Sequence, residues 1–431
     1  MRILGVGDWN DLGDLYMRLA AAGHEVRVHI GDPRAQDILE GMIHRCGDWR
    51  AELPWIRAAG NDGVIVFETA YHGPIQDALR ADGYQVIGGC ACGDRLEADR
   101  AFGQRMMAEA GMKVMPAWEF ATAHEARTFI RNHPARYVLK HSAVTGADLP
   151  TYVGRSHSGS DVAAVLELEG RGPSPERILL SPHIDGVEVG VGAYFNGERF
   201  LEPACLDWEH KSFFPGGIGE LTGEMGTLVT YRGADELFSR TLARCAGQLR
   251  AVGYVGYINL NTIVDGRGVW PLEFTCRFGY PGYAILDPLQ SDGWPDLFRR
   301  LLDRGSSAFA TLPGFAVGIV VTVPPFPYPF GYEQLGKGTA IDLSDVLPGD
   351  ADHLHFAEVA RHGDGLVCSG HLGCPLVVTG IGSDAACAQR EAYQRVERVV
   401  IANMRYRNDI ASAFIAGDEA RMRAWGWLAS C

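Results

Sequence analysis

The stretch Pro271-Leu-Glu-Phe-Thr-Cys-Arg-Phe-Gly-Tyr-Pro281 decides how the rest of the chain is interpreted. Its pattern predicts a β-strand, and side chains two residues apart on a strand share a face, so Glu273, Thr275 and Arg277 project together. A carboxylate, a second oxygen and a guanidinium in a row suit Mg²⁺ bridging phosphate groups, with a cation over the group being transferred. The ordinary alternative is a two-faced strand with a surface ion pair.

Three nearby features could extend such a site. The preceding strand, paired through a glycine turn at 266–268, offers Asn259 and Asn261. The run Glu209-His210-Lys211 is followed by a loop rich in glycine, including Gly223, whose backbone N–H groups can approach a ligand. Lys140 ends an apolar strand. Glycine-rich surface loops and solvated lysines at strand ends are both common, so each feature alone remains open.

The N-terminal region predicts a doubly wound parallel sheet, because short strands at 2–6, 24–30, 63–67 and 84–88 alternate with helical patterns. A helix is then predicted over about 94–110. The loop from Gly5 to Asn10, with Asp32 after the next strand, resembles a dinucleotide fingerprint, but Asn10 replaces its third glycine. A dehydrogenase is therefore one alternative, and a plain strand–turn–helix with acidic residues at the helix start is the other.

Composition narrows the class of protein. The 431 residues carry 39 Lys+Arg and 53 Asp+Glu, a net charge of −14, which argues against a nucleic-acid partner. No segment reaches the roughly 18 consecutive apolar residues of a membrane helix, so we expect no membrane partner. Ten cysteines without a paired metal-ligand spacing are interpreted as reduced thiols, and the cytoplasm is the expected compartment.

The order of these motifs resembles the ATP-grasp ligases, specifically the glycinamide ribonucleotide synthetase (phosphoribosylamine–glycine ligase) family. Glu273-Phe-Thr-Cys-Arg-Phe-Gly is similar to the family's Glu-Phe-Asn-Cys-Arg-Phe-Gly. Glu209-His-Lys and the later Leu221-Thr-Gly-Glu-Met-Gly are similar to Asp-His-Lys and Asn-Thr-Gly-Gly-Met-Gly. Leu96-Glu-Ala-Asp-Arg-Ala-Phe, Val138-Leu-Lys and the segment from Ile178 to Glu188 also match, so the resemblance covers nearly the whole chain.

This resemblance implies an α/β and α+β fold of ATP-grasp architecture. The implied domains are an N-terminal doubly wound domain over 1–95, an ATP-grasp domain over 96–313 with a lid at about 114–184, and a C-terminal α+β domain over 314–431. The implied reaction is ATP-dependent: a carboxylate becomes an acyl phosphate, an amine attacks it, and ADP and phosphate leave. The implied cofactors are ATP and Mg²⁺ or Mn²⁺, and the partners are a small carboxylate and an amine; no oligomeric state is predicted.

The resemblance also implies a role for each candidate residue. The implied metal ligands are Glu273, Thr275 and Asn261. The catalytic side chains are Arg277, for the γ-phosphate and acyl phosphate, and Lys211. The nucleotide contacts are Arg100, Lys140, Ser181, His183, Ile184, Glu188 and Gly223. The substrate candidates are Asp8, Glu68, His210 and Tyr280.

The chain departs from the family pattern at several positions, and these departures change which substrate we expect. The family's Gly-Gly-Arg-Glu-His-Ala becomes Gly7-Asp-Trp-Asn-Asp-Leu12, placing acids where a phosphorylated substrate would anchor. Its Lys-containing phosphate loop becomes 144–150 without a lysine, and its metal-binding Asn becomes Thr275. We therefore expect a carboxylate–amine ligase whose substrates do not include phosphoribosylamine. The alternatives are a genuine phosphoribosylamine–glycine ligase and a non-enzymatic nucleotide-binding homologue.

Overall fold

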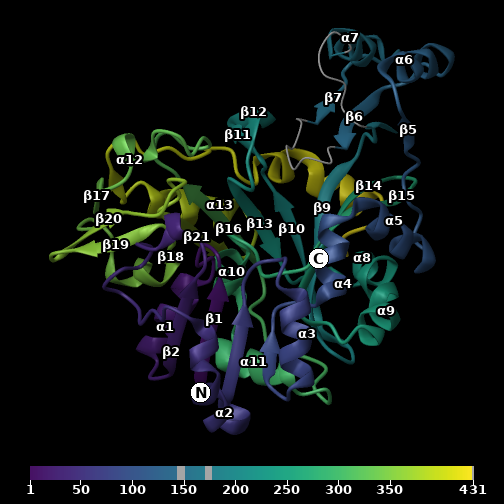
Figure 1. Cartoon of the computed structure of the whole chain (residues 1–431). Helices are drawn as coiled ribbons and strands as arrows, with labels where there is room; N and C mark the ends of the chain where they lie inside the picture. Colours follow the sequence, from purple (N-terminus) through teal and green to yellow (C-terminus); the bar gives the residue numbers. More distant parts are fainter. Residues whose placement is uncertain (143–150, 170–176, 430–431) are drawn as a thin grey trace. The chain divides into compact units, whose positions relative to one another are not determined.

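A computed structural model describes residues 1–142, 151–169 and 177–429 (Figure 1). The chain forms two compact units. The larger comprises Met1–Met112, Glu188–Thr262 and Glu273–Cys431, and the smaller Lys113–Val187 and Ile263–Leu272. The predicted lid at 114–184 lies within the smaller unit. The boundaries predicted at 95 and 313 both lie inside the larger unit, so the three-domain division stays a prediction.

The chain begins with the parallel sheet that the sequence predicts. Its strand order is β2-β1-β3-β4, and every pairing is parallel. Buried aliphatic side chains of β1 and β3 form its core. Such strands are apolar along their length because a parallel sheet is covered on both faces. Its elements are β1 (Arg2–Gly7), α1 (Gly13–Ala21), β2 (Glu25–Ile30), α2 (Leu53–Ala58), β3 (Gly63–Phe67), α3 (Gly73–Ala81) and β4 (Gln85–Ile87).

The helix predicted over 94–110 is two helices, α4 (Ala91–Ala98) and α5 (Arg100–Glu109). The break falls at Asp99, whose backbone is extended with φ −104° and ψ 90°. Its carboxylate accepts a hydrogen bond of 2.9 Å from the Phe102 N–H and so caps α5. Residue 100 thereby becomes the first residue of α5.

An eight-stranded sheet forms the centre of the larger unit, in the order β15-β14-β9-β10-β13-β16-β21-β18. The β9–β10 hairpin turns at Gly197, whose φ of 85° is the left-handed conformation that short hairpin turns require. The strands are β9 (Val187–Asn196), β10 (Phe200–Glu209), β13 (Gly226–Thr230), β14 (Val255–Asp265), β15 (Gly268–Thr275), β16 (Phe315–Val321), β18 (Leu354–Phe356) and β21 (Leu376–Gly382).

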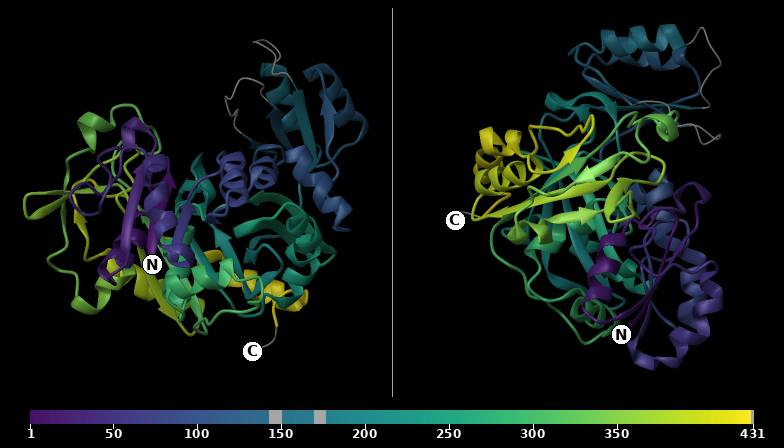
Figure 2. Two further views of the ribbon diagram at one scale, coloured as in Figure 1. Left: turned by 60° about the horizontal axis from the view of Figure 1, so that its bottom comes forward. Right: turned by 90° about the vertical axis from the view of Figure 1, so that its left-hand side faces the viewer.

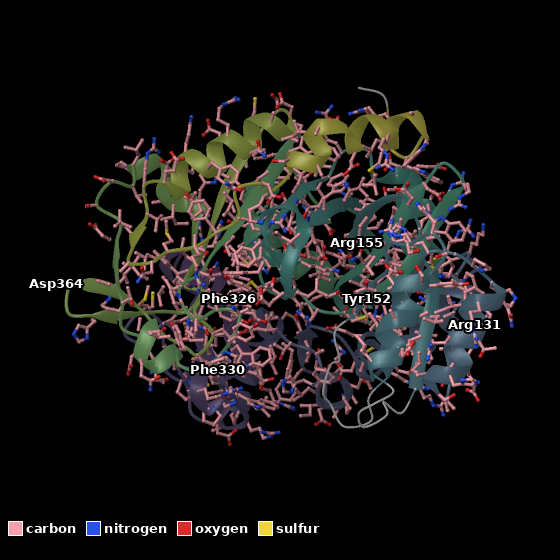
Figure 3. The ribbon with its side chains drawn as sticks, turned by 90° about the horizontal axis from the view of Figure 1, so that it is seen from above. Arg131, Tyr152, Arg155, Phe326, Phe330 and Asp364 are labelled. Carbon is pink, nitrogen blue, oxygen red and sulfur yellow. The ribbon has the colours of Figure 1, made fainter. Side chains whose placement is uncertain are left out.

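Helices and two smaller sheets complete the larger unit. The helices are α8 (Asp235–Arg240), α9 (Ala246–Ala251), α10 (Gly282–Leu286), α11 (Trp294–Leu302), α12 (Tyr332–Leu335), α13 (Ala385–Val396) and α14 (Glu419–Ala424). The small sheets are β11 (Ser212–Phe214) with β12 (Ile218–Leu221), and β19 (Val359–His362), β20 (Gly365–Cys368), β17 (Ala340–Asp342) and β22 (Val400–Ile401). Asp364 lies at the tip of the β19–β20 hairpin (Figure 3).

The smaller unit is a sheet in the order β5-β8-β6-β7, with two helices on one face (Figure 2). Alternation gives the sheet an apolar face, on which Leu139 and Leu180 pack against Ile130 and Leu166 of the helices. Its elements are β5 (Trp118–Phe120), α6 (Ala123–Asn132), β6 (Tyr137–Ser142), β7 (Tyr152–Val153), α7 (Ser160–Glu169) and β8 (Arg177–Pro182). No helix among the described residues of either unit is long and apolar enough to cross a membrane.

The cap of α5 gives a first prediction. Replacing Asp99→Ala removes the acceptor for the Phe102 N–H and should lower the free energy of unfolding by about 1 kcal/mol. Asp99→Asn keeps an acceptor oxygen and is the matched control, expected to change stability by only a few tenths of a kcal/mol. Urea denaturation of the three proteins measures both. Equal stability of Asp99→Ala and wild type would show that the cap contributes nothing.

Candidate active site

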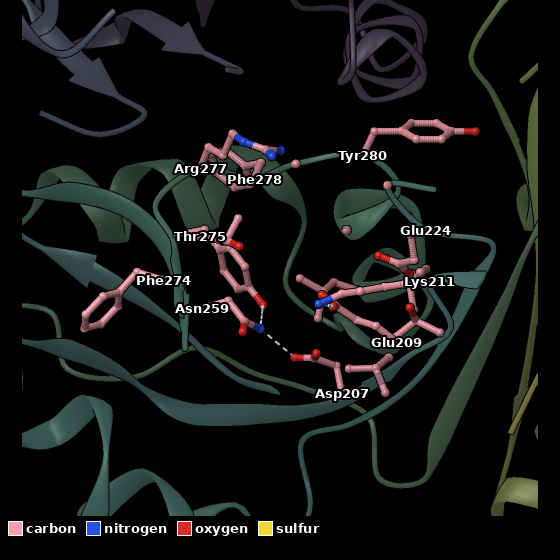
Figure 4. Close-up of a pocket in the computed structure, with 18 of the residues that line it drawn as sticks. Asp207, Glu209, Lys211, Glu224, Asn259, Phe274, Thr275, Arg277, Phe278 and Tyr280 are labelled. Carbon is pink, nitrogen blue, oxygen red and sulfur yellow. Dashed lines mark hydrogen bonds and ion pairs between the residues drawn. The ribbon is translucent and has the colours of Figure 1, made fainter. Parts of the chain in front are cut away.

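A pocket of about 300 Å³ lies wholly within the larger unit (Figure 4). Its walls come from β10, β13, β14 and β15 and from the segments that follow β12 and β15. Six of the residues predicted from sequence line it: Lys211, Gly223, Glu273, Thr275, Arg277 and Tyr280. The strand alternation predicted for Glu273, Thr275 and Arg277 therefore does bring these three side chains to one cavity.

Lys211 lies at the centre of a charged cluster at this pocket. Its Nζ atom is 3.1 Å from Glu209 Oε2, 3.4 Å from Glu188 Oε1 and 3.7 Å from Glu273 Oε1. Arg100, at the start of α5, forms an ion pair with the other oxygen of Glu273. Burial alone would lower the pKa of Lys211, but the three carboxylates raise it above its ordinary value. The ammonium group is therefore charged at neutral pH.

Asn261 joins this cluster through Glu188. Its Nδ2 donates a hydrogen bond of 2.8 Å to Glu188 Oε1, which leaves its own oxygen buried and without a hydrogen-bond partner in the described chain. An oxygen in that state fits a cation or a ligand donor. Among residues 1–142, 151–169 and 177–429, no group of three or more His, Cys, Asp or Glu side chains is arranged to hold a metal. A cation bound here would need further ligands from outside this set of side chains, and phosphate oxygens are suitable ones.

Arg277 is held by Glu97, a residue that the sequence analysis missed. Glu97 Oε1 accepts from Arg277 Nε at 2.9 Å, and Glu97 Oε2 accepts from the Cys276 N–H at 2.9 Å. One carboxylate therefore fixes both the side chain and the backbone before it. Burial would lower the pKa of Arg277, but Glu97 and Asp11 raise it. Glu97 lies in α4, and no pattern in the sequence links it to Arg277.

Asp207 and Glu224 also line the pocket and were missed. Side chains two apart on β10 share a face, so Asp207 and Glu209 point the same way. That spacing is the signal that could have revealed Asp207. Its Oδ2 accepts a hydrogen bond of 2.6 Å from Asn259 Nδ2 in β14, across the intervening strand β9. The residue of β9 paired with Asp207 is Gly190, where a Cβ would lie 2.1 Å from Asp207 Oδ1.

His210 is a correction to the predicted substrate contacts. It falls between the pocket-lining Glu209 and Lys211, so its side chain is directed to the other side of the chain. There its Nε2 lies 3.3 Å from the Ala411 N–H. Burial and the Arg407 charge lower its pKa to about 4. The structure thus places a neutral, packed histidine where the sequence predicted a substrate contact.

The two N-terminal substrate candidates, Asp8 and Glu68, differ in their exposure to solvent. Asp8 is half-exposed and close to the His72 ring, at 3.5 Å, and hydrogen bonding to His72 lowers its pKa. Glu68 has no exposed surface: its Oε2 lies against Gly7 and accepts from the Leu12 N–H at 3.3 Å. Burial, with the neighbouring Asp11 charge, raises the pKa of Glu68 to about 8. Its position behind the loop is that of a support for the start of α1 rather than of a substrate contact.

The remaining nucleotide candidates belong to the smaller unit. Val138 pairs with Ser181 and Lys140 with Leu179, so Lys140 and Ser181 lie on the face of the sheet opposite the Leu139–Leu180 core. His183 follows β8, and its N–H donates to the Arg136 carbonyl at 2.9 Å; Ile184 comes next. The segment 144–150, expected to correspond to the phosphate loop, lies outside the described residues.

Comparison with known proteins places these features in a family context. Residues 98–283 match the family model "Phosphoribosylglycinamide synthetase, ATP-grasp (A) domain". The phosphoribosylamine–glycine ligase of Neisseria meningitidis serogroup B is 25% identical over 438 residues, covering 96% of this chain and 100% of that protein. The ligase of the same name from Synechocystis is 27% identical over 348 residues, covering 78% of this chain and 80% of that protein.

Solved structures show the same fold. The phosphoribosylamine–glycine ligase of Thermotoga maritima aligns with a TM-score of 0.69 at 22% identity, over 95% of this chain and 100% of that one. A biotin carboxylase from Campylobacter jejuni aligns with a TM-score of 0.61 at 12% identity, over 97% and 95%. The predicted ATP-grasp architecture is confirmed. The chain is an ATP-grasp ligase, an ADP-forming enzyme that joins a carboxylate to an amine, and it resembles phosphoribosylamine–glycine ligase.

Proposed function

We propose that this ligase works through an acyl phosphate. A carboxylate oxygen of the acid substrate attacks the γ-phosphorus of ATP, and ADP leaves. The amine nitrogen then attacks the acyl carbon, phosphate leaves with the bonding electron pair, and the nitrogen loses a proton. The observation that supports this most is the convergence of three candidates beside Arg277. Lys211, a catalytic candidate, and Glu273, a metal candidate, line one pocket, and Arg100, a nucleotide candidate, is paired with Glu273.

ATP with Mg²⁺ is the cofactor pair of an ATP-grasp ligase of this type. We assign Glu273, Thr275 and Asn261 to the metal, which neutralises phosphate charge when bound. The ammonium of Lys211 and the guanidinium of Arg100 now face carboxylates at the pocket. Bound phosphate groups would compete for these two cations. The cluster thus keeps its cations charged and in place before the nucleotide enters.

Arg277 is assigned to the transferring group. Its bond to Glu97 restricts the guanidinium to one orientation, and charge that is held in place costs little reorganisation when negative charge develops on the phosphoryl oxygens. Phosphoryl transfer depends largely on such positioning and charge stabilisation. Lys211 supplies a second fixed positive charge at the same pocket.

For the substrates, we propose phosphoribosylamine as the amine and glycine as the acid. The curated relatives that align over most of this chain carry that activity in their names, at 25% and 27% identity. They favour this pair over our expectation from the sequence that phosphoribosylamine is excluded. That expectation rested mainly on the changed N-terminal loop.

A different, unphosphorylated amine is the second candidate, and one observation favours it. Burial raises the pKa of Asp11 to about 6; the Arg277 charge lowers it, and the Asp8 and Glu358 charges raise it. The Asp11 carboxyl group therefore lies within electrostatic range of Asp8, Glu358 and Arg277. A phosphate dianion seated beside them would meet like charges.

Replacing Glu273→Gln tests the ligase mechanism. The substitution keeps the shape but removes the carboxylate assigned to Mg²⁺, so ADP release should fall by about 10²-fold or more. A coupled assay for ADP at saturating Mg²⁺ measures it, with the exposed Asp345→Asn as the matched control. Wild-type ADP release in Glu273→Gln would overturn the metal assignment.

The substrate pair has its own test. Wild-type protein should release ADP with phosphoribosylamine plus glycine, and omission of either should abolish the release. Mass spectrometry identifies the amide product. If phosphoribosylamine is inactive while an unphosphorylated primary amine supports turnover with the same acid, the second candidate replaces the first.

A further inference from the structure

A buried carboxylate near the pocket takes no part in the proposed chemistry. Glu358 immediately precedes β19 and is 7% exposed. Its Oε1 accepts hydrogen bonds from the N–H groups of His371 and Leu372, at 2.9 and 3.0 Å. Its Oε2 accepts from the N–H groups of Gly373 and Cys374, at 2.5 and 2.9 Å. Four successive backbone N–H groups thus converge on one carboxylate.

The segment that supplies these donors, residues 370–374, has the geometry of an anion-binding turn, and we call it the amide loop. The φ angle is 71° at Gly370 and 92° at Gly373, in the left-handed region that glycine adopts at little cost. A Cβ at Gly370 would lie 2.5 Å from Glu358 Oε1, so this glycine also leaves space for the carboxylate. Successive N–H groups that point into such a turn form a concave site for an anion.

The amide loop binds its anion through the backbone. The His371 ring is also close, with Nδ1 3.5 Å from Glu358 Oε1. Burial lowers the pKa of His371, and the Glu358 charge raises it by less, so this ring is neutral at pH 7. Hydrogen bonds from N–H groups to a carboxylate are stronger than those between neutral groups. The four N–H donors belong to the main chain, so they would remain if the Glu358 side chain were removed.

The amide loop lies near both the pocket and the loop that follows β1. The centroid of the His371 ring is 6.2 Å from that of Trp9, two residues after β1. Tyr280 lines the pocket; burial raises its pKa well above the ordinary value, and nearby charges that include Glu358 raise it further. The Glu358 carboxylate is therefore within electrostatic range of a pocket-lining side chain.

Other hydrogen bonds hold the amide loop and β19 against the N-terminal region. The Gly370 N–H donates to Asp37 Oδ1 at 3.1 Å. The Leu39 N–H donates to the Val359 carbonyl, in β19, at 2.6 Å. Neither bond uses the Glu358 carboxylate. We therefore expect the amide loop to keep these attachments when that carboxylate is absent.

We propose that the amide loop is an anion-binding site and that Glu358 is its resident anion. Glu358 then determines whether an anionic group of the amine substrate, such as a phosphate, can bind there. While the carboxylate fills the loop, a phosphate cannot reach the same N–H groups, because two anions cannot share one set of donors. Removing the side chain frees four donors for phosphate oxygens.

This inference deepens the second candidate, the unphosphorylated amine, and rests on the proposed function where it concerns turnover. If phosphoribosylamine is the amine, its phosphate binds elsewhere in the wild-type protein. The binding of a free anion by a variant that lacks the Glu358 carboxylate does not depend on the reaction at all.

Calorimetry with inorganic phosphate tests the site without turnover. Wild type and Glu358→Gly are titrated with Mg²⁺ and a non-hydrolysable ATP analogue present, so that nucleotide phosphate groups already occupy their own place. Glu358→Gly should bind phosphate at least about tenfold more tightly than wild type. Glu358→Gln is the matched control, because its amide keeps the space filled and should gain no phosphate binding. Equal phosphate binding by Glu358→Gly and wild type would overturn the proposal.

Thermal unfolding covers a variant that is poorly folded. Loss of the hydrogen bonds should lower the Tm of Glu358→Gly, and phosphate should restore part of it, unlike chloride at equal ionic strength. Glu358→Ala is a second variant, without the added backbone freedom of glycine. If the carboxylate only ties the loop in place, phosphate will change the Tm of wild type and both variants equally, which would overturn the site. Variants that stay unfolded at every phosphate concentration would also overturn it.

Steady-state kinetics separates this inference from the proposed function. The ratio of kcat/KM for phosphoribosylamine to that for ribosylamine, which lacks only the phosphate, should rise at least about tenfold from wild type to Glu358→Gly, through KM. Phosphate binding by Glu358→Gly without ADP release by any of the proteins would overturn the ligase proposal and leave the anion site standing. ADP release with an unchanged ratio would overturn the role of Glu358 in substrate choice and leave the ligase proposal standing.

Discussion

The ion pairs of Glu273 are the interaction on which the site depends. Its two oxygens face Arg100 from α5 and Lys211 from the end of β10, so one carboxylate joins a helix and two strands that are far apart in sequence. All three side chains are partly exposed, and such pairs contribute about 0–1 kcal/mol each to stability. Under the proposed function, their importance lies in holding opposite charges in place until a nucleotide and its metal bind.

Two glycines in the large sheet leave space for polar side chains of the neighbouring strands. Gly190 and Gly192 leave room on β9 for the side chains of the strands on either side, Asp207 from β10 and Tyr257 from β14. Two of the 54 glycines of the chain thus have a specific structural role at this position. Glycine normally lowers the stability of a sheet interior, and here it leaves the space that the neighbouring polar side chains occupy.

Much of the candidate site could be predicted from local patterns in the sequence. Alternation along a strand placed Glu273, Thr275 and Arg277 on one face, and the motif order suggested the ATP-grasp fold, which the comparisons confirm. The same alternation, applied to the strand before Lys211, would have included Asp207 and excluded His210. The expectation that phosphoribosylamine is not a substrate rested mainly on the N-terminal loop and is not supported by the relatives, which carry that activity in their names.

The sequence by itself determined the elements, the face on which each strand displays its polar residues, and the resemblance to a family. It could do so because period-two alternation and short motifs are properties of neighbouring residues. Only the tertiary structure decided that Glu97 holds Arg277, that Glu68 is buried behind its loop, and that Asp207 and Glu224 face one cavity. Each of those facts depends on desolvation or on contact between segments that are distant in sequence. Neither can be predicted from the order of neighbouring residues.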